Sequence, residues 1–68
     1  MERVSVNDVG KILSVSGISN VEYEKMEMIK IGCQLNQLYK EDVLYMANSG
    51  TTVHAAQRRL AQRRREYE

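Results

Sequence analysis

Proline is absent from this sequence, and cysteine and histidine occur once each among its 68 residues. Cys33 alone cannot form an internal disulfide, so no covalent cross-link supports a core that must be small in a chain of this length. His54 has no second histidine and no thiol at ligand spacing, which argues against a metal site. The chain therefore needs another source of stability, and a partner chain is the obvious one.

Long apolar runs are missing as well, so nothing in the sequence is suited to span a bilayer. There is neither a signal-peptide pattern nor a low-complexity segment. The sequence also lacks a Ser/His/Asp or Cys/His set and a glycine-rich phosphate loop, and its acidic residues are scattered. These absences predict one soluble, cytoplasmic domain over residues 1–68 that is not an enzyme. We expect no cofactor, no small-molecule substrate and no membrane contact.

Positive charge is concentrated at one end of the chain. Residues 58–68 carry five arginines against two glutamates, whereas residues 1–57 carry five basic and seven acidic residues. A basic end on a near-neutral body is compatible with binding a polyanion. Cations also favour the C-terminal end of a helix, so a solvated helix end explains the same residues.

The first expected helix spans residues 6–16. The stretch "SVND" has the spacing of a capping box that begins at Ser5. Gly17 can end the helix in a left-handed conformation. The stretch "ILSVSGISNV" alternates and is rich in β-branched residues, so a short strand there is the alternative. The apolar side of the helix would consist of Val6, Val9, Ile12 and Leu13.

A long helix over residues 20–48 is the dominant expected element. The stretch "SNVE" predicts a cap at Ser19, and apolar residues keep helical spacing until "NSG". Roughly 27 residues at 1.5 Å each give about 40 Å, whereas a compact chain of this length is about 28 Å across. The apolar stripe therefore requires a second molecule, and a homodimer is the economical source.

The expected dimer interface follows that stripe. Gly32 lies near the midpoint of the long helix, where a close approach of two crossing helices would favour glycine. The interface would comprise Met28, Ile31, Gly32, Leu35, Leu38, Tyr39, Val43 and Met46.

A third helix is expected over residues 52–66, with Thr51 or Thr52 as its cap. At about 100° per residue, its five arginines cannot share one narrow stripe, so part of the cluster is expected to pair with acids of the protein itself. We expect Arg59, Arg63 and Arg64 to face outward.

The order of a short, a long and a short helix resembles the histone fold. The segment "VGKILSVSG" is similar to the first-helix segment of archaeal histones, and "TVHAAQRRLAQRR" is similar to their third-helix segment. The resemblance covers residues 4–65. It implies an all-α handshake dimer, or a larger oligomer such as a tetramer, that binds double-stranded DNA without sequence preference and organises a nucleoid.

The loops depart from the family's pattern. The loop before the third helix carries basic residues in the family, but here it reads "SGTTV", and Gln57 stands where the family has an aspartate. The loop "GISNV" also lacks its basic residue. We therefore expect the third-helix arginines to take over the phosphate contacts. The expected DNA-binding residues are Lys11, Thr51, Thr52, Arg58, Arg59, Arg63, Arg64 and Arg65.

Two other functions remain open. A helical protein-interaction module without strong DNA binding fits the basic-poor loops and the net charge of +1. A small helix-turn-helix regulator from a mobile element would use "VNDVGKIL" and "EYEKMEMI" as its two helices. Its second helix would then carry Glu22, Glu24 and Glu27 into a negatively charged groove, which disfavours that function.

Overall fold

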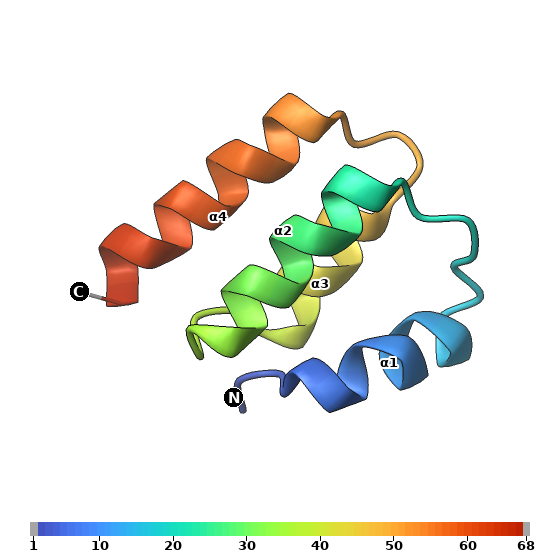
Figure 1. Cartoon of the computed structure of the whole chain (residues 1–68), viewed down its shortest axis with the longest axis horizontal. Coiled ribbons are helices and arrows are strands. Elements are labelled where there is room, and N and C mark those ends of the chain that lie inside the picture. Colours follow the sequence, from blue (N-terminus) through green and yellow to red (C-terminus); the bar gives the residue numbers. More distant parts are fainter. Residues whose placement is uncertain (1, 68) are drawn as a thin grey trace.

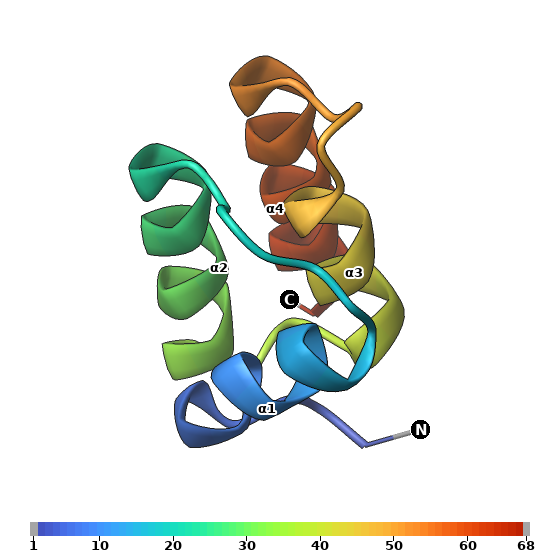
Figure 2. The ribbon, with the colours of Figure 1, turned by 90° about the vertical axis from the view of Figure 1, so that its right-hand side faces the viewer.

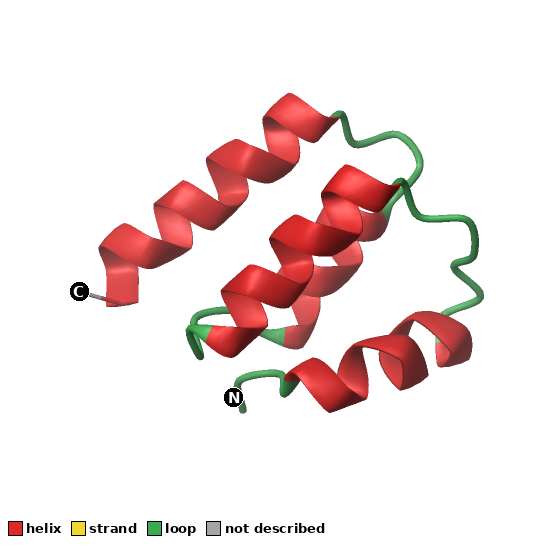
Figure 3. Cartoon of the chain, in the orientation of Figure 1, coloured by secondary structure: helices red, strands yellow, loops and turns green. Residues whose placement is uncertain are grey.

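The computed structural model describes residues 2–67, and its ordered elements are all helical (Figures 1 and 3). No strand occurs within this range, and an isolated antiparallel bridge joins Arg3 to Tyr39. The predicted all-α class is therefore confirmed, and the strand alternative is wrong. In chain order the elements are the 3-10 turn η1 (Val6–Asp8), α1 (Val9–Val15), α2 (Tyr23–Gln34), α3 (Lys40–Ala47) and α4 (Val53–Tyr67).

Helices α2 and α3 form the middle of the fold. They pack against each other and both pack against α4, and α1 packs against α3 (Figures 1 and 2). Helix α4 lies at the edge of the molecule, with α2 and α3 on one side of it. None of the helices within residues 2–67 is long and apolar enough to cross a membrane.

The first predicted helix begins and ends close to its expected bounds. Ser5 caps it, since its Oγ accepts a hydrogen bond from the Asn7 amide at 3.3 Å. Gly17 follows the last residues of α1 with a φ of +72°. The amide of Ile18 donates back to the carbonyl of Leu13 at 2.9 Å, which satisfies an end-of-helix carbonyl. The one difference is that the first turn is a 3-10 turn, so α1 itself starts at Val9.

The predicted long helix over residues 20–48 is wrong, because the chain reverses between α2 and α3. Asn36 adopts a φ of +57°, a left-handed conformation that asparagine tolerates better than most residues. The amide of Gln37 then donates to the carbonyl of Gly32 at 3.0 Å and closes α2. Helix α3 starts afresh, with the Asp42 carboxylate accepting the Tyr39 amide at 2.9 Å.

This reversal lets the chain bury its own apolar stripe. Leu38, Val43 and Met46 are fully buried within one chain. The length argument for a second molecule therefore no longer holds, and the long central helix of a histone fold is absent from residues 2–67. Of the other expected interface residues, Met28 and Tyr39 are half-buried, while Ile31 and Leu35 stay more than 40% exposed.

Gly32 has a different role from the predicted one. A Cβ atom at this position would lie 2.5 Å from Cδ1 and 2.6 Å from Cγ of Leu38, and 2.9 Å from Cδ1 of Leu60. Those atoms belong to the same chain, so glycine is required here by the packing of α2 against α4 and against the loop before α3. The expected crossing of two molecules does not explain it.

Lys25 ties the start of α2 to the connection between α3 and α4. Its ammonium is buried and donates to the backbone carbonyls of Asn48 at 2.9 Å and Thr51 at 2.7 Å. The predicted cap at Ser19 is wrong, since α2 starts after Glu22 with no side-chain cap. The Asn48 carbonyl also accepts the Thr51 amide at 2.9 Å. The two carbonyls give the buried ammonium the hydrogen-bond acceptors that a buried polar group needs.

The buried thiol of Cys33 should react slowly with thiol reagents. Burial raises the pKa of Cys33 from its ordinary value of 9.0 to about 11, which lowers its thiolate fraction at pH 8 on the order of a hundredfold. Reaction with an aromatic disulfide, followed by absorbance, should be slower by at least this factor in the folded chain than in denaturant. Equal rates would contradict the burial of Cys33.

The same shift predicts how stability depends on pH. The folded chain favours the neutral thiol, so this contribution to stability is intact below pH 9.0 and is lost as the pH rises towards about 11. The difference in free energy of unfolding between the parent and Cys33→Ala should be constant below about pH 9 and should change only in that window, where the parent loses stability relative to the variant.

Candidate nucleic-acid interface

Helix α4 has one buried side and one solvent-facing side. Ala56 and Leu60 point into the core, and Leu60 lies beside Gly32 of α2. We call the exposed residues His54, Gln57, Arg58, Ala61, Gln62, Arg64 and Arg65 the outer face of α4. This division follows from a helix repeat of about 3.6 residues. Glu66 and Tyr67, at the end of α4, are exposed as well. Glu66 pairs with Arg63 and is not counted with the outer face, whose seven residues include no acid.

The two threonines before α4 serve the backbone. Thr52 is the predicted cap, and its Oγ1 accepts a hydrogen bond from the Ala55 amide at 3.1 Å. The Thr51 hydroxyl donates to the carbonyl of Tyr45 at 2.8 Å. Both hydroxyls are therefore engaged within the chain at the point where α4 begins.

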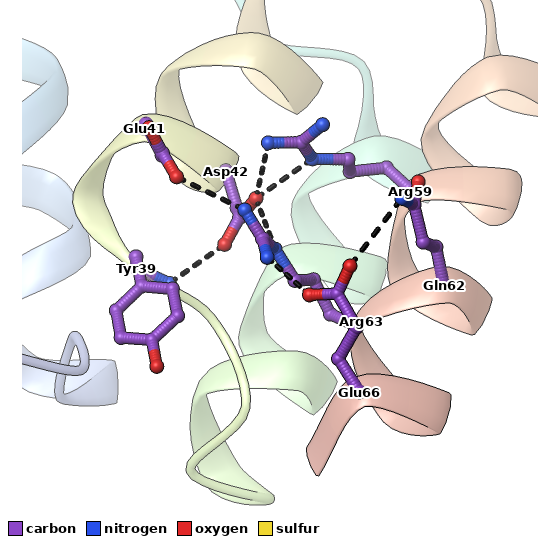
Figure 4. A network of polar contacts seen from close by, with 7 residues as sticks. All are labelled: Tyr39, Glu41, Asp42, Arg59, Gln62, Arg63 and Glu66. Carbon is purple, nitrogen blue, oxygen red and sulfur yellow. Dashed lines mark hydrogen bonds and ion pairs between the residues drawn. The ribbon is translucent and has the colours of Figure 1, made fainter.

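The inner flank of α4 holds two arginines on one buried carboxylate (Figure 4). The Asp42 side chain is fully buried, and its Oδ1 lies 2.7 Å from Nε of both Arg59 and Arg63. Its Oδ2 accepts the amide of Tyr39. Because every acceptor oxygen of this buried charge has a donor, the group is compensated in a site that excludes water.

Arg63 also forms ion pairs with two other acidic residues. It contacts Glu41 at 2.9 Å, and it pairs with Glu66 on its own helix. The hydrogen bond to Asp42 is the largest of the effects that raise the pKa of Arg63 above its ordinary value. The guanidinium also lies over the Tyr39 ring, 5.4 Å from its centroid. Arg63 is thus a fixed structural cation.

The five arginines of α4 therefore divide into two groups. Arg59 and Arg63 pair with Asp42, so the expectation that they face outward is wrong; the expected pairing of part of the cluster with the protein's own acids is confirmed. Arg58, Arg64 and Arg65 are exposed, as predicted for Arg64. They form no ion pair with any residue in the described range 2–67.

Lys11 lies away from this surface. It is exposed on α1, and α2 and α3 lie between α1 and α4 (Figure 1). The structure therefore does not bring Lys11 together with the arginines of α4.

Asp42 is a functional residue of this network that the sequence pattern did not predict, because the acidic residues are scattered along the chain. The signal was its position. It lies at helical spacing between Leu38 and Met46, in a row that is otherwise apolar, and an acid in such a row needs a buried cation.

The remaining surface offers no comparable cluster. A cavity of about 690 Å³ is an open hollow between the loop before α2 and the loop before α4. Within residues 2–67, no three side chains of His, Cys, Asp or Glu are grouped to hold a metal ion.

Comparisons with protein-family models, with curated proteins and with solved structures find no match to this chain.

Proposed function

We propose that this chain binds double-stranded DNA through the outer face of α4. The observation that carries the proposal is the state of the arginines: Arg58, Arg64 and Arg65 are exposed with no acid on their face. The neighbouring acids Asp42 and Glu66 are held by other arginines.

The pairing on the inner flank keeps the acids beside α4 engaged with other cations. Arg59 and Arg63 pair there with Asp42, Glu41 and Glu66, so none of these acids pairs with the exposed arginines. Helix α4 is about 22 Å long, and duplex DNA carries one negative charge per roughly 1.7 Å of its axis. Three exposed cations on such a helix can therefore contact phosphates at once, without reading sequence.

The proposal does not need a histone-fold dimer. The chain covers most of its own apolar stripe, so a monomer can present α4. A dimer, a larger oligomer and a role in organising a nucleoid remain predictions of the sequence resemblance. Light scattering at micromolar concentration tests the first two.

Replacing Arg58, Arg64 and Arg65 together with glutamine should weaken binding to duplex DNA. Each phosphate contact contributes roughly 0.9 to the slope of log K against log salt concentration, so the triple variant should lose a slope of about 2.7. Fluorescence anisotropy of a random-sequence labelled duplex over a salt series measures this change. The side chains are exposed, so the circular dichroism spectrum and thermal unfolding should not change.

The matched control removes three charges elsewhere. Lys11, Lys30 and Lys40 are also exposed, and their replacement with glutamine changes the net charge by the same amount. An equal loss of binding in both triple variants would show a general charge effect and overturn the site. If the slope of log K against log salt concentration were unchanged in the arginine variant, those arginines would not contact phosphates and would only be solvated residues at a helix end.

A failure of the parent to bind duplex DNA at low salt would overturn the function itself. Exposed Ile31 and Leu35 on α2 would then favour the protein-interaction function.

A further inference from the structure

The geometry points to a specific mode of binding: α4 enters the major groove of B-form DNA with Ala61 at the point of closest approach. This inference rests on the proposed function and deepens it, because phosphate binding alone needs no groove.

The position of α4 allows such an entry. The helix lies at the edge of the fold and is covered on one side by α2 and α3 (Figures 1 and 2). Its diameter with side chains is about 10–12 Å, and the major groove of B-form DNA is about 12 Å wide. A helix packed on all sides could not enter the groove, whereas α4 can do so without unfolding.

The outer face has a shape that suits close approach. His54, Arg58, Ala61 and Arg65 recur at intervals of four, three and four residues, so they fall within an arc of about 60°. Ala61 is the smallest member of this row and is exposed. The row therefore has long polar side chains at both ends and a low point between them, where the backbone of α4 can come nearest to the base edges.

The residues beside Ala61 have the chemistry that reads bases. Arg58 has no ion pair with the described residues, so at a preferred sequence it can exchange its phosphate contact for guanine O6 and N7, which arginine binds with two hydrogen bonds. Gln62 has one side-chain contact, to Glu66 at 3.4 Å, which is long for a hydrogen bond. The amide can exchange this long contact for hydrogen bonds to adenine N6 and N7.

The spacing of these two residues limits the preferred sequence. Arg58 and Gln62 are separated by about 6 Å along α4, which is less than two base steps of about 3.4 Å each. A preferred duplex should therefore contain a guanine and an adenine within about two base pairs of each other. Double-stranded RNA cannot accept α4 in this way, since the major groove of an A-form helix is deep and narrow.

The experiment places a larger side chain at the low point. Ala61→Leu adds bulk on the exposed side of a helix with little effect on helix propensity, so thermal unfolding should match that of the parent. Binding to duplex DNA should weaken by about tenfold or more. Ser14→Leu, at an exposed position of α1, is the matched control and should bind like the parent.

A second arm compares duplexes of one sequence at one salt concentration. The parent should bind the DNA duplex at least about tenfold more tightly than the RNA duplex. Selection from a random DNA pool should enrich duplexes in which a guanine and an adenine lie within about two base pairs of each other. The Gln62→Ala variant should lose the preference for the selected duplex but keep the parent's affinity for random duplex.

The outcomes separate the two claims. If Ala61→Leu binds DNA like the parent and the RNA duplex binds equally well, entry into the groove is overturned; the proposed function then stands on the loss of salt slope in the arginine triple variant. If the parent binds no duplex, both are overturned.

Discussion

Replacing Asp42 with alanine should unfold this chain at room temperature. The change removes the buried carboxylate that pairs with both Arg59 and Arg63, and it removes the acceptor for the Tyr39 amide. Removing one partner of a buried ion pair costs about 3–5 kcal/mol, and a core of this size supplies about 3–5 kcal/mol of stability in total. Urea denaturation followed by circular dichroism measures the loss directly.

Two further substitutions in the same network separate the effect of the Asp42 charge from the effect of its buried position. Glu41 contacts Arg63 from an exposed position, so Glu41→Gln should cost less than about 1 kcal/mol. Asp42→Asn keeps an oxygen for the Tyr39 amide but removes the charge, and it should fall between the other two. If Asp42→Ala were no worse than Glu41→Gln, the buried carboxylate would not organise α3 and α4.

Gly32→Ala should also destabilise the fold, despite replacing a helix-interior glycine with the best helix former. The gain in helix propensity is about 1 kcal/mol, but the new methyl group would overlap with Leu38 and Leu60. Leu38 is fully buried, so any shift of its side chain must displace other core atoms. Overpacking of this kind costs about 1–3 kcal/mol before the propensity gain is counted, so we expect a net loss in urea denaturation.

Gly10→Ala provides the matched control. Gly10 lies in α1, and apart from its chain neighbours and the backbone of its own helix no heavy atom lies within 4 Å of the place where its Cβ would be. Its substitution should leave stability unchanged or raise it by up to about 1 kcal/mol. The loss in Gly32→Ala should be independent of protein concentration, because the contacts are internal. If the urea midpoint rose with protein concentration, the protein would be a dimer or larger oligomer, and Gly32 could lie in the interface between its chains.

Local signals in the sequence predicted the ends of several helices. Ser5, Gly17 and Thr52 act through hydrogen bonds or backbone conformation within a few residues, and such effects can be read from neighbouring letters. The predicted bounds of the last helix, 52–66, differ from those of α4 by one residue at each end. The all-α class follows from the same local patterns.

The reversal at Asn36 could not be read in this way. Apolar residues keep helical spacing on both sides of it, so the pattern continues through a break in the backbone. The conformation is decided by whether residues after the break can pack against those before it, as Leu38 does against Gly32. The choice between one long helix and two short ones is therefore a tertiary effect, and the asparagine was its only local sign.

The division of the arginines needed tertiary information too. The helical wheel separates Arg59 and Arg63 from Arg58 and Arg65, but it does not say which pair meets the core. That choice is made by Asp42, which lies 17 and 21 residues away in the sequence. A candidate interface drawn from charge alone therefore included two residues that hold the fold together.

The buried ammonium of Lys25 sets a condition for protein engineering. The α3–α4 hairpin carries the outer face and looks like a unit that could be transplanted to another scaffold. Its connecting loop, however, has two carbonyls that bind a cation supplied by α2. A graft of residues 39–67 alone would leave that cation behind. A host would have to present a lysine at the equivalent place for the hairpin to keep its geometry.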